Sequence, residues 1–156
     1  MTTYKQLRSD LTVHWIIVVT MLILLIGYNI ICHVMASDIQ IYLEQQQRIL
    51  IRTILYAIAI ILFPLASLMR HIFIRLNQTM PGSTPAKNRY LITIVVSLCI
   101  IETVGLFGFI MFILGDDYNT LYIFSVMSLL GIYLHRPKLE EYEQLIEALR
   151  VQKLNL

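Results

Sequence analysis

The chain alternates between long apolar stretches and short polar segments. The apolar stretches cover about residues 11–32, 49–69, 91–114 and 119–135. At 1.5 Å per residue, a helix of about 20 residues crosses the hydrocarbon core of a bilayer, which is about 30 Å thick. Since each stretch reaches or approaches that length, the pattern predicts four membrane-spanning helices. We expect an all-α protein that folds as a four-helix transmembrane bundle.

The polar segments predict details of the helix ends. Ser37 and Asp38 resemble a helix N-cap, so the second helix is expected to begin there, outside the lipid. Pro64 lies inside the second stretch and is expected to kink its helix, because proline lacks a backbone donor. The fourth stretch is the shortest, and it is expected to cross with little tilt or where neighbouring helices thin the bilayer.

A different pattern follows the fourth stretch. In residues 137–156 apolar side chains recur at a period close to 3.6, and glutamates occupy the other side. Pro137 suits the first turn of a helix. This segment is expected to form a cytoplasmic amphipathic helix that packs against the cytoplasmic ends of neighbouring subunits. Its apolar positions are Leu139, Tyr142, Leu145, Ile146 and Leu149.

Composition favours a single membrane domain. Of the 156 residues, 58% are hydrophobic and 14% are charged, whereas soluble domains carry about 25% charged residues. We expect one transmembrane domain over 1–136, followed by the helical tail over 137–156. Cys32 and Cys99 fall in different spans at different depths, which disfavours a disulfide, and no metal-ligand spacing occurs. No metal site, cofactor or nucleic-acid partner is therefore expected.

Charge is distributed unevenly among the segments that join the spans. Basic residues gather at the N-terminus, between the second and third spans, and at the start of the tail, whereas the other two loops carry the acidic residues. By the positive-inside rule, both termini lie in the cytoplasm. We expect an integral protein of the bacterial inner (plasma) membrane, whose basic side chains either set this topology or bind lipid headgroups. The candidates for headgroup contacts are Arg52, Arg70, Arg75, Arg136 and Lys138.

Glu102 is the single charged residue of the third stretch and lies near the predicted bilayer midplane. A carboxylate at that depth is costly, so it must be protonated, hydrogen-bonded, hydrated or bound to a cation. Cys99 and Gly105 share its helix face, and Gly105 together with Gly108 lets another helix approach closely. Glu102 is therefore expected to face a protein interface, either as a proton or cation site or as an interhelical hydrogen-bonding residue.

The run IETVGLFG at 101–108 resembles the carboxylate-bearing helix of rotary ATP synthase proteolipid (c) subunits. In that family a mid-membrane Glu is followed six residues later by Gly, as Glu102 is followed by Gly108, and a cytoplasmic loop precedes the helix. The resemblance implies that Glu102 matches the carboxylate that carries a proton or a sodium ion. It covers about one helix: residues 51–67 lack the repeated glycines that pack a c-ring, and four spans with a C-terminal helix also depart from the family.

Two functional hypotheses follow from these features. In the first, a homo-oligomer passes protons, cations or a small solute, with Glu102 as the protonatable group. In the second, the protein is a non-catalytic scaffold or an accessory subunit of a larger membrane complex, in which Glu102 holds helices together. An enzyme is not favoured and no catalytic residue is proposed, since the sequence has no His/Glu metal motif, no nucleophile elbow and no Cys–His pair in register.

Overall fold

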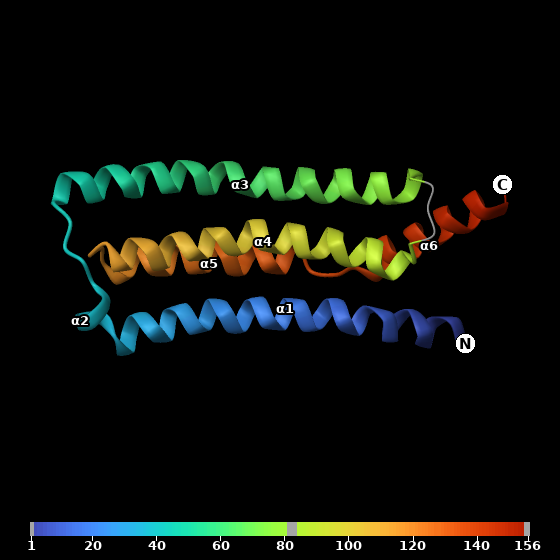
Figure 1. Cartoon of the computed structure of the whole chain (residues 1–156), viewed down its shortest axis with the longest axis horizontal. Helices are drawn as coiled ribbons and strands as arrows, with labels where there is room; N and C mark the ends of the chain where they lie inside the picture. The colour runs from blue at the N-terminus through green and yellow to red at the C-terminus, as the bar shows by residue number, and fades with distance from the viewer. Residues whose placement is uncertain (1, 81–83, 155–156) are drawn as a thin grey trace.

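The computed structural model describes residues 2–80 and 84–154, and every regular element in these two ranges is a helix. The four longest helices run along one axis, and the last helix follows at the end where the first begins (Figure 1). The all-α prediction is confirmed. The helices are α1 (Thr2–Val34), α2 (Ala36–Ile39), α3 (Gln45–Thr79), α4 (Ala86–Ile113), α5 (Tyr118–Leu134) and α6 (Leu139–Leu154).

Three of these helices are long and apolar enough to cross a membrane: α1 from Ser9 onward, α3 and α4. α5 is also apolar but shorter, at 17 residues. The outer faces of α1 and α3 expose large apolar side chains, such as Ile23 (62% exposed) and Ile60 (67%). Extended apolar surface of this kind marks contact with a membrane or with other proteins. The apolar stretches therefore turn much of their surface outward.

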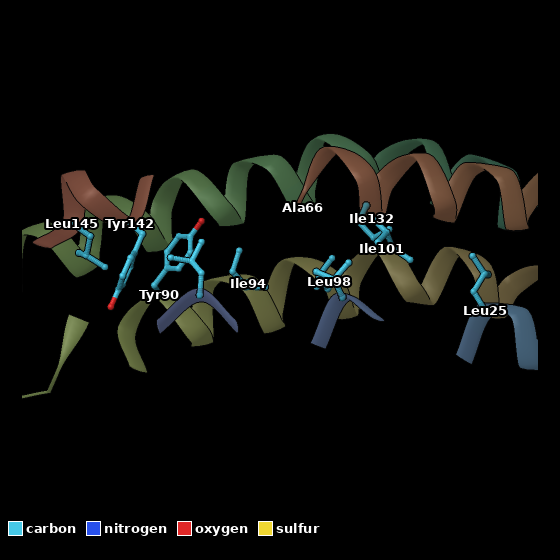
Figure 2. Packing of buried hydrophobic residues seen from close by; sticks show 11 residues of the cluster. Leu25, Ala66, Tyr90, Ile94, Leu98, Ile101, Ile132, Tyr142 and Leu145 are labelled. Atoms are coloured by element: carbon cyan, nitrogen blue, oxygen red, sulfur yellow. The ribbon is translucent and has the colours of Figure 1, made fainter. Parts of the chain in front are cut away.

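α4 lies at the centre of the molecule and contacts α1, α3, α5 and α6. In the most apolar 18-residue stretch of each helix, 50% of α4 is buried, compared with 17% of α1 and 11% of α3. α1 packs on it through a seven-residue repeat, in which Leu11, Val18, Leu25 and Cys32 are buried. Leu25 belongs to one apolar cluster with Ile101 of α4 (Figure 2). The two helices run in the same direction along the molecule (Figure 1).

Glycines allow α4 and α5 to approach each other closely. A Cβ atom at Gly108 would lie 2.9 Å from Phe124 Cβ and 3.1 Å from the carbonyl oxygen of Leu121. A Cβ atom at Gly131 of α5 would lie 2.5 Å from Ile101 Cγ2. No larger residue fits at either position unless its neighbours move, which is the use that membrane helices make of glycine at contacts.

The connection between α1 and α3 differs from the prediction. Ser37 and Asp38 lie inside the short α2, and the prediction that the second long helix begins there is wrong, since α3 begins at Gln45. Before α3, the amide of Ile41 donates a hydrogen bond to the carbonyl oxygen of Ile113 at the end of α4 (2.6 Å). A tertiary contact therefore holds this segment in place of the predicted helical hydrogen bonds.

α3 continues past the apolar stretch at 49–69 and ends at Thr79, with Pro64 inside it. Its last turns are tied to α4, because the side-chain amide of Asn77 donates to the Arg89 carbonyl oxygen and to Thr93 Oγ1, both at 3.0 Å. These polar contacts explain why the helix extends well beyond its apolar part.

The amphipathic helix expected over 137–156 is present as α6, and residues 155–156 lie outside the described residues. α6 contacts α1, α3 and α4 of its own chain, and its residues Tyr142 and Leu145 are buried there (Figure 2). The apolar face that was expected to pack on neighbouring subunits is thus used within the chain.

Candidate functional site

The carboxyl group of Glu102 is enclosed by the helices around α4. Glu102 is 8% exposed, and both carboxyl oxygens are buried without a hydrogen-bond partner among the described residues. Leu98 and Ile101 beside it belong to the apolar cluster that α4 shares with α1 (Figure 2). The hydroxyl of Tyr28 on α1 is close enough to interact with the carboxyl, although it is not in hydrogen-bonding geometry. Glu102 is thus a polar group inside an otherwise apolar contact.

No charged side chain of the described residues acts on the Glu102 carboxyl. Two arginines of α3 are engaged elsewhere, Arg52 with Asp116 and Arg70 with Glu141. Burying an unpaired carboxylate costs far more than burying a neutral polar group. The buried, unpaired position therefore suits the neutral, protonated form of the carboxyl.

The predicted neighbours of Glu102 have three different surroundings. Gly105 is buried where α4 meets both α1 and α5, since a Cβ atom there would lie 2.7 Å from Leu25 Cδ1 and 3.1 Å from Ser128 Oγ. Gly108 faces α5. Cys99 is exposed. The structure therefore places Gly105 at the α1–α4 contact together with Glu102, and it leaves Cys99 on the outer surface.

The sequence pattern does not predict two polar pairs between α1 and α5. The side-chain amide of Asn29 donates to Ser125 Oγ (3.0 Å), and His33 Nε2 lies 2.8 Å from the Tyr122 hydroxyl oxygen. Both pairs line a groove of about 570 Å³ between the two helices. A polar side chain within each apolar stretch is the sequence feature that points to such pairs, but sequence spacing does not reveal which two helices become neighbours.

Arg70 joins α3 to the segment between α5 and α6. Its side chain is 9% exposed and donates to the carbonyl oxygens of His135 and Arg136 and, at 2.7 Å, to Glu141 Oε2. The hydroxyl of Tyr90 donates to the same carboxylate oxygen at 3.2 Å. The Arg70 guanidinium, predicted from the sequence to contact lipid headgroups, thus donates its hydrogen bonds to acceptors within the protein.

Tyr142 holds α6 against the beginning of α1. Its hydroxyl donates to Asp10 Oδ2 (3.3 Å), and its ring centroid lies 5.5 Å from that of Tyr90 and 6.1 Å from that of His14. Burial, reinforced by the Asp10 carboxylate, raises the pKa of Tyr142 to about 12. The neutral phenol is therefore the form that fits this contact.

Arg52 has a structural contact at the opposite end of the molecule. Its Nη1 lies 3.2 Å from Oδ1 of Asp116, a buried residue, and Arg48 Nε lies 3.8 Å from the same oxygen. Arg48 also donates to the carbonyl oxygen of Gly115 (2.6 Å), where the backbone has a φ of +84° that favours glycine. These contacts fasten the turn between α4 and α5 onto α3.

The other three basic candidates keep access to their surroundings. Arg75 is exposed. The guanidinium carbon of Arg136 lies 4.3 Å from the centroid of the Tyr133 ring. The side chain of Lys138 is 52% exposed, although its Nζ lies 3.8 Å from Glu141 Oε1. These three residues stay available for the headgroup contacts that the sequence predicts.

No protein-family model, curated protein sequence or solved structure matches this chain. Among the described residues, no group of three or more His, Cys, Asp and Glu side chains is arranged to hold a metal ion. A functional assignment therefore depends on the physical chemistry of the residues around Glu102.

Proposed function

We propose that this protein is an integral membrane protein that crosses the bilayer four times, with both termini in the cytoplasm. Three helices have the length and composition of a span, and the fourth, α5, is about 25 Å long, so the bilayer around it must thin slightly. Supporting the orientation, the last part of α3 and the segment between α5 and α6 lie toward the end of the molecule where α1 begins (Figure 1), and they carry Arg70, Arg75, Arg136 and Lys138.

Within the membrane, Glu102 binds and releases a proton as the protonatable group of an ion-passing assembly. The observation that carries this proposal is the pair of buried carboxyl oxygens without a hydrogen-bond partner among the described residues. Buried polar atoms without hydrogen-bond partners are rare in proteins. Acidic residues inside membrane spans mark pathways for ions and protons.

A proton fits these surroundings better than a metal cation. Hard cations are held by six or more oxygen ligands. Apart from its own two oxygens, the Glu102 carboxyl interacts with one side-chain oxygen among the described residues, that of Tyr28. The proposed substrate is therefore the proton, ahead of other cations or a small solute.

Passage across the membrane is assigned to a homo-oligomer or to a larger membrane complex. α4 is already surrounded by helices of its own chain, so its carboxyl is not exposed on a pore wall. The exposed apolar faces of α1 and α3 leave surface for lipid and for further subunits.

The second candidate function is a scaffold or accessory subunit in which Glu102 holds helices together. The interaction with Tyr28 favours it, because a small movement of either side chain would create a hydrogen bond between α1 and α4. Such bonds contribute about 0.6–2 kcal/mol in membranes.

Proton flux into liposomes separates the two functions. The samples are the wild type, Glu102→Gln, and the matched control Glu147→Gln, which makes the same change at an exposed position of α6. Transport through Glu102 predicts flux in the wild type and the control and none in Glu102→Gln, with the oligomeric state unchanged in detergent. Absence of flux in all three samples, with altered assembly of Glu102→Gln, would favour the scaffold.

A further inference from the structure

Polar side chains are distributed unevenly on the two sides of Glu102. Toward the end of the molecule that carries the α4–α5 turn, α1 presents Tyr28, then Asn29 with Ser125, then His33 with Tyr122. Toward the other end, the contact between α1 and α4 is formed by apolar residues such as Val18, Met21, Ile94 and Leu98 until His14.

The polar residues follow one another along the axis toward the turn. The Tyr28 ring stacks on Phe109 of α4 with centroids 5.5 Å apart, and Cys32 packs in one cluster with Phe112. α1 and α4 therefore stay in parallel register from Glu102 to the end of α4. From Tyr28 to His33 the distance along α1 is about 7.5 Å, less than two helical turns.

The groove between α1 and α5 brings open volume to the two polar pairs but not to Tyr28. Most of its lining is aliphatic and continues inward to Leu22 and Leu25, and its polar residues are Asn29, His33, Tyr122 and Ser125. Leu25 lies between this groove and α4, since a Cβ atom at Gly105 would lie 2.7 Å from Leu25 Cδ1. The Leu25 side chain thus lies between the groove and Gly105, which is three residues from Glu102 on α4.

We propose that Glu102 exchanges its proton with the membrane face that carries His33, by a route on the side of Tyr28 and the Asn29–Ser125 pair. This inference rests on the proposed function, because it takes Glu102 as the proton-binding group. On uptake, an O–H bond forms at the carboxyl and the bond between that proton and a water molecule breaks. On release the same steps run in reverse, with no change of oxidation state.

Few titratable groups lie near Glu102 and His33 among the described residues. Tyr28 of α1 is the titratable group that interacts with Glu102, and no charged group of α3 or α5 acts on it among the described residues. Around His33, the rings of Tyr118 and Tyr122 lie at 4.8 and 5.9 Å. On the apolar side of Glu102, the nearest titratable residue of α1 is His14, which is more than three helical turns from Tyr28.

Labelling with a hydrophobic carbodiimide tests the route without relying on net flux. The reagent adds as a whole molecule to a protonated carboxyl and rearranges to a stable N-acylurea, which mass spectrometry locates at Glu102. The protein is placed in phosphatidylcholine vesicles in one orientation, fixed by a C-terminal affinity tag. The pH is then stepped on one face at a time, and labelling is measured immediately after the step.

The wild type should lose labelling several-fold when the pH is raised on the His33 face, and its response to the same step on the other face should be several-fold slower. Asn29→Leu should slow this response several-fold, with Ser125→Ala as the second variant if Asn29→Leu fails to fold. The matched control is Thr20→Val, which removes a polar group from an exposed position of α1. It should behave as the wild type.

Labelling that follows the opposite face, both faces equally or neither face would overturn the proposed route. Failure of the proposed function looks different: wild-type liposomes would show no proton flux while the one-sided response of Glu102 labelling persisted.

Discussion

Replacement of Gly108 by alanine tests the close approach of α4 and α5. The new Cβ atom would lie 2.9 Å from Phe124 Cβ and 3.1 Å from the Leu121 carbonyl oxygen, whereas carbon atoms in good contact are about 3.5–4.0 Å apart. One of these neighbours is backbone, so the two helices must separate by several tenths of an ångström. Gly27→Ala on α1 is the matched control, because nothing lies within 4 Å of its Cβ position.

The magnitude follows from two opposing effects. Alanine favours a helix over glycine by about 1 kcal/mol at both positions. Overpacking costs about 1–3 kcal/mol, and it applies only at Gly108. Gly27→Ala is therefore expected to be neutral or stabilising, and Gly108→Ala should be less stable than Gly27→Ala by about 1–3 kcal/mol.

Thermal unfolding in a mild detergent, followed by circular dichroism, measures this difference. With a shift of about 2–4 °C per kcal/mol for a chain of this size, the melting temperatures of the two variants should differ by about 2–12 °C. If Gly108→Ala melts at or above the temperature of Gly27→Ala, α4 and α5 do not approach at Gly108 as closely as the structure has it.

Two further predictions concern the docking of α6. Arg70→Gln removes the donors that hold Glu141 and the α5–α6 connection, so trypsin should cleave that connection several-fold faster than in the wild type, whereas Arg75→Gln at an exposed position should not change cleavage; equal cleavage of the two variants would contradict this role. Because burial raises the pKa of Tyr142 to about 12, its neutral form stabilises the docked helix below about pH 10, and this contribution is lost as the pH rises toward 12. Tyr142→Phe should remove one late-ionising phenol from an ultraviolet titration of tyrosinate, and loss of a phenol that ionises near pH 10 would contradict the assignment.

The sequence predicts the helices well because the signal for them is local. Long apolar stretches define α1, α3, α4 and α5, and a 3.6-residue period defines α6. The burial of Glu102 against a protein interface also follows from local information, since glycine three residues away marks a side of the helix that another helix can approach.

What the sequence does not predict depends on contacts between distant residues. The pairing of Asn29 with Ser125 joins positions 96 residues apart, and the partners of Arg70 lie more than 60 residues beyond it. The exposure of Cys99 has a geometric reason: Cys99 and Gly105 lie three residues before and after Glu102, so they diverge from it in opposite directions and are about 120° apart around the axis. Cys99 therefore falls outside the buried face that Glu102 shares with Gly105.

The most direct test of the central claim is infrared difference spectroscopy of the protein in lipid during a pH titration. A protonated carboxyl and a carboxylate have separate absorption bands, so the state of Glu102 is observed without a transport assay. The account predicts a carboxylic-acid band that converts reversibly to carboxylate as the pH rises, that is missing in Glu102→Gln and that persists in Glu147→Gln. A band that stays constant at every pH at which the protein is folded, or one that Glu102→Gln leaves unchanged, would contradict proton exchange at Glu102.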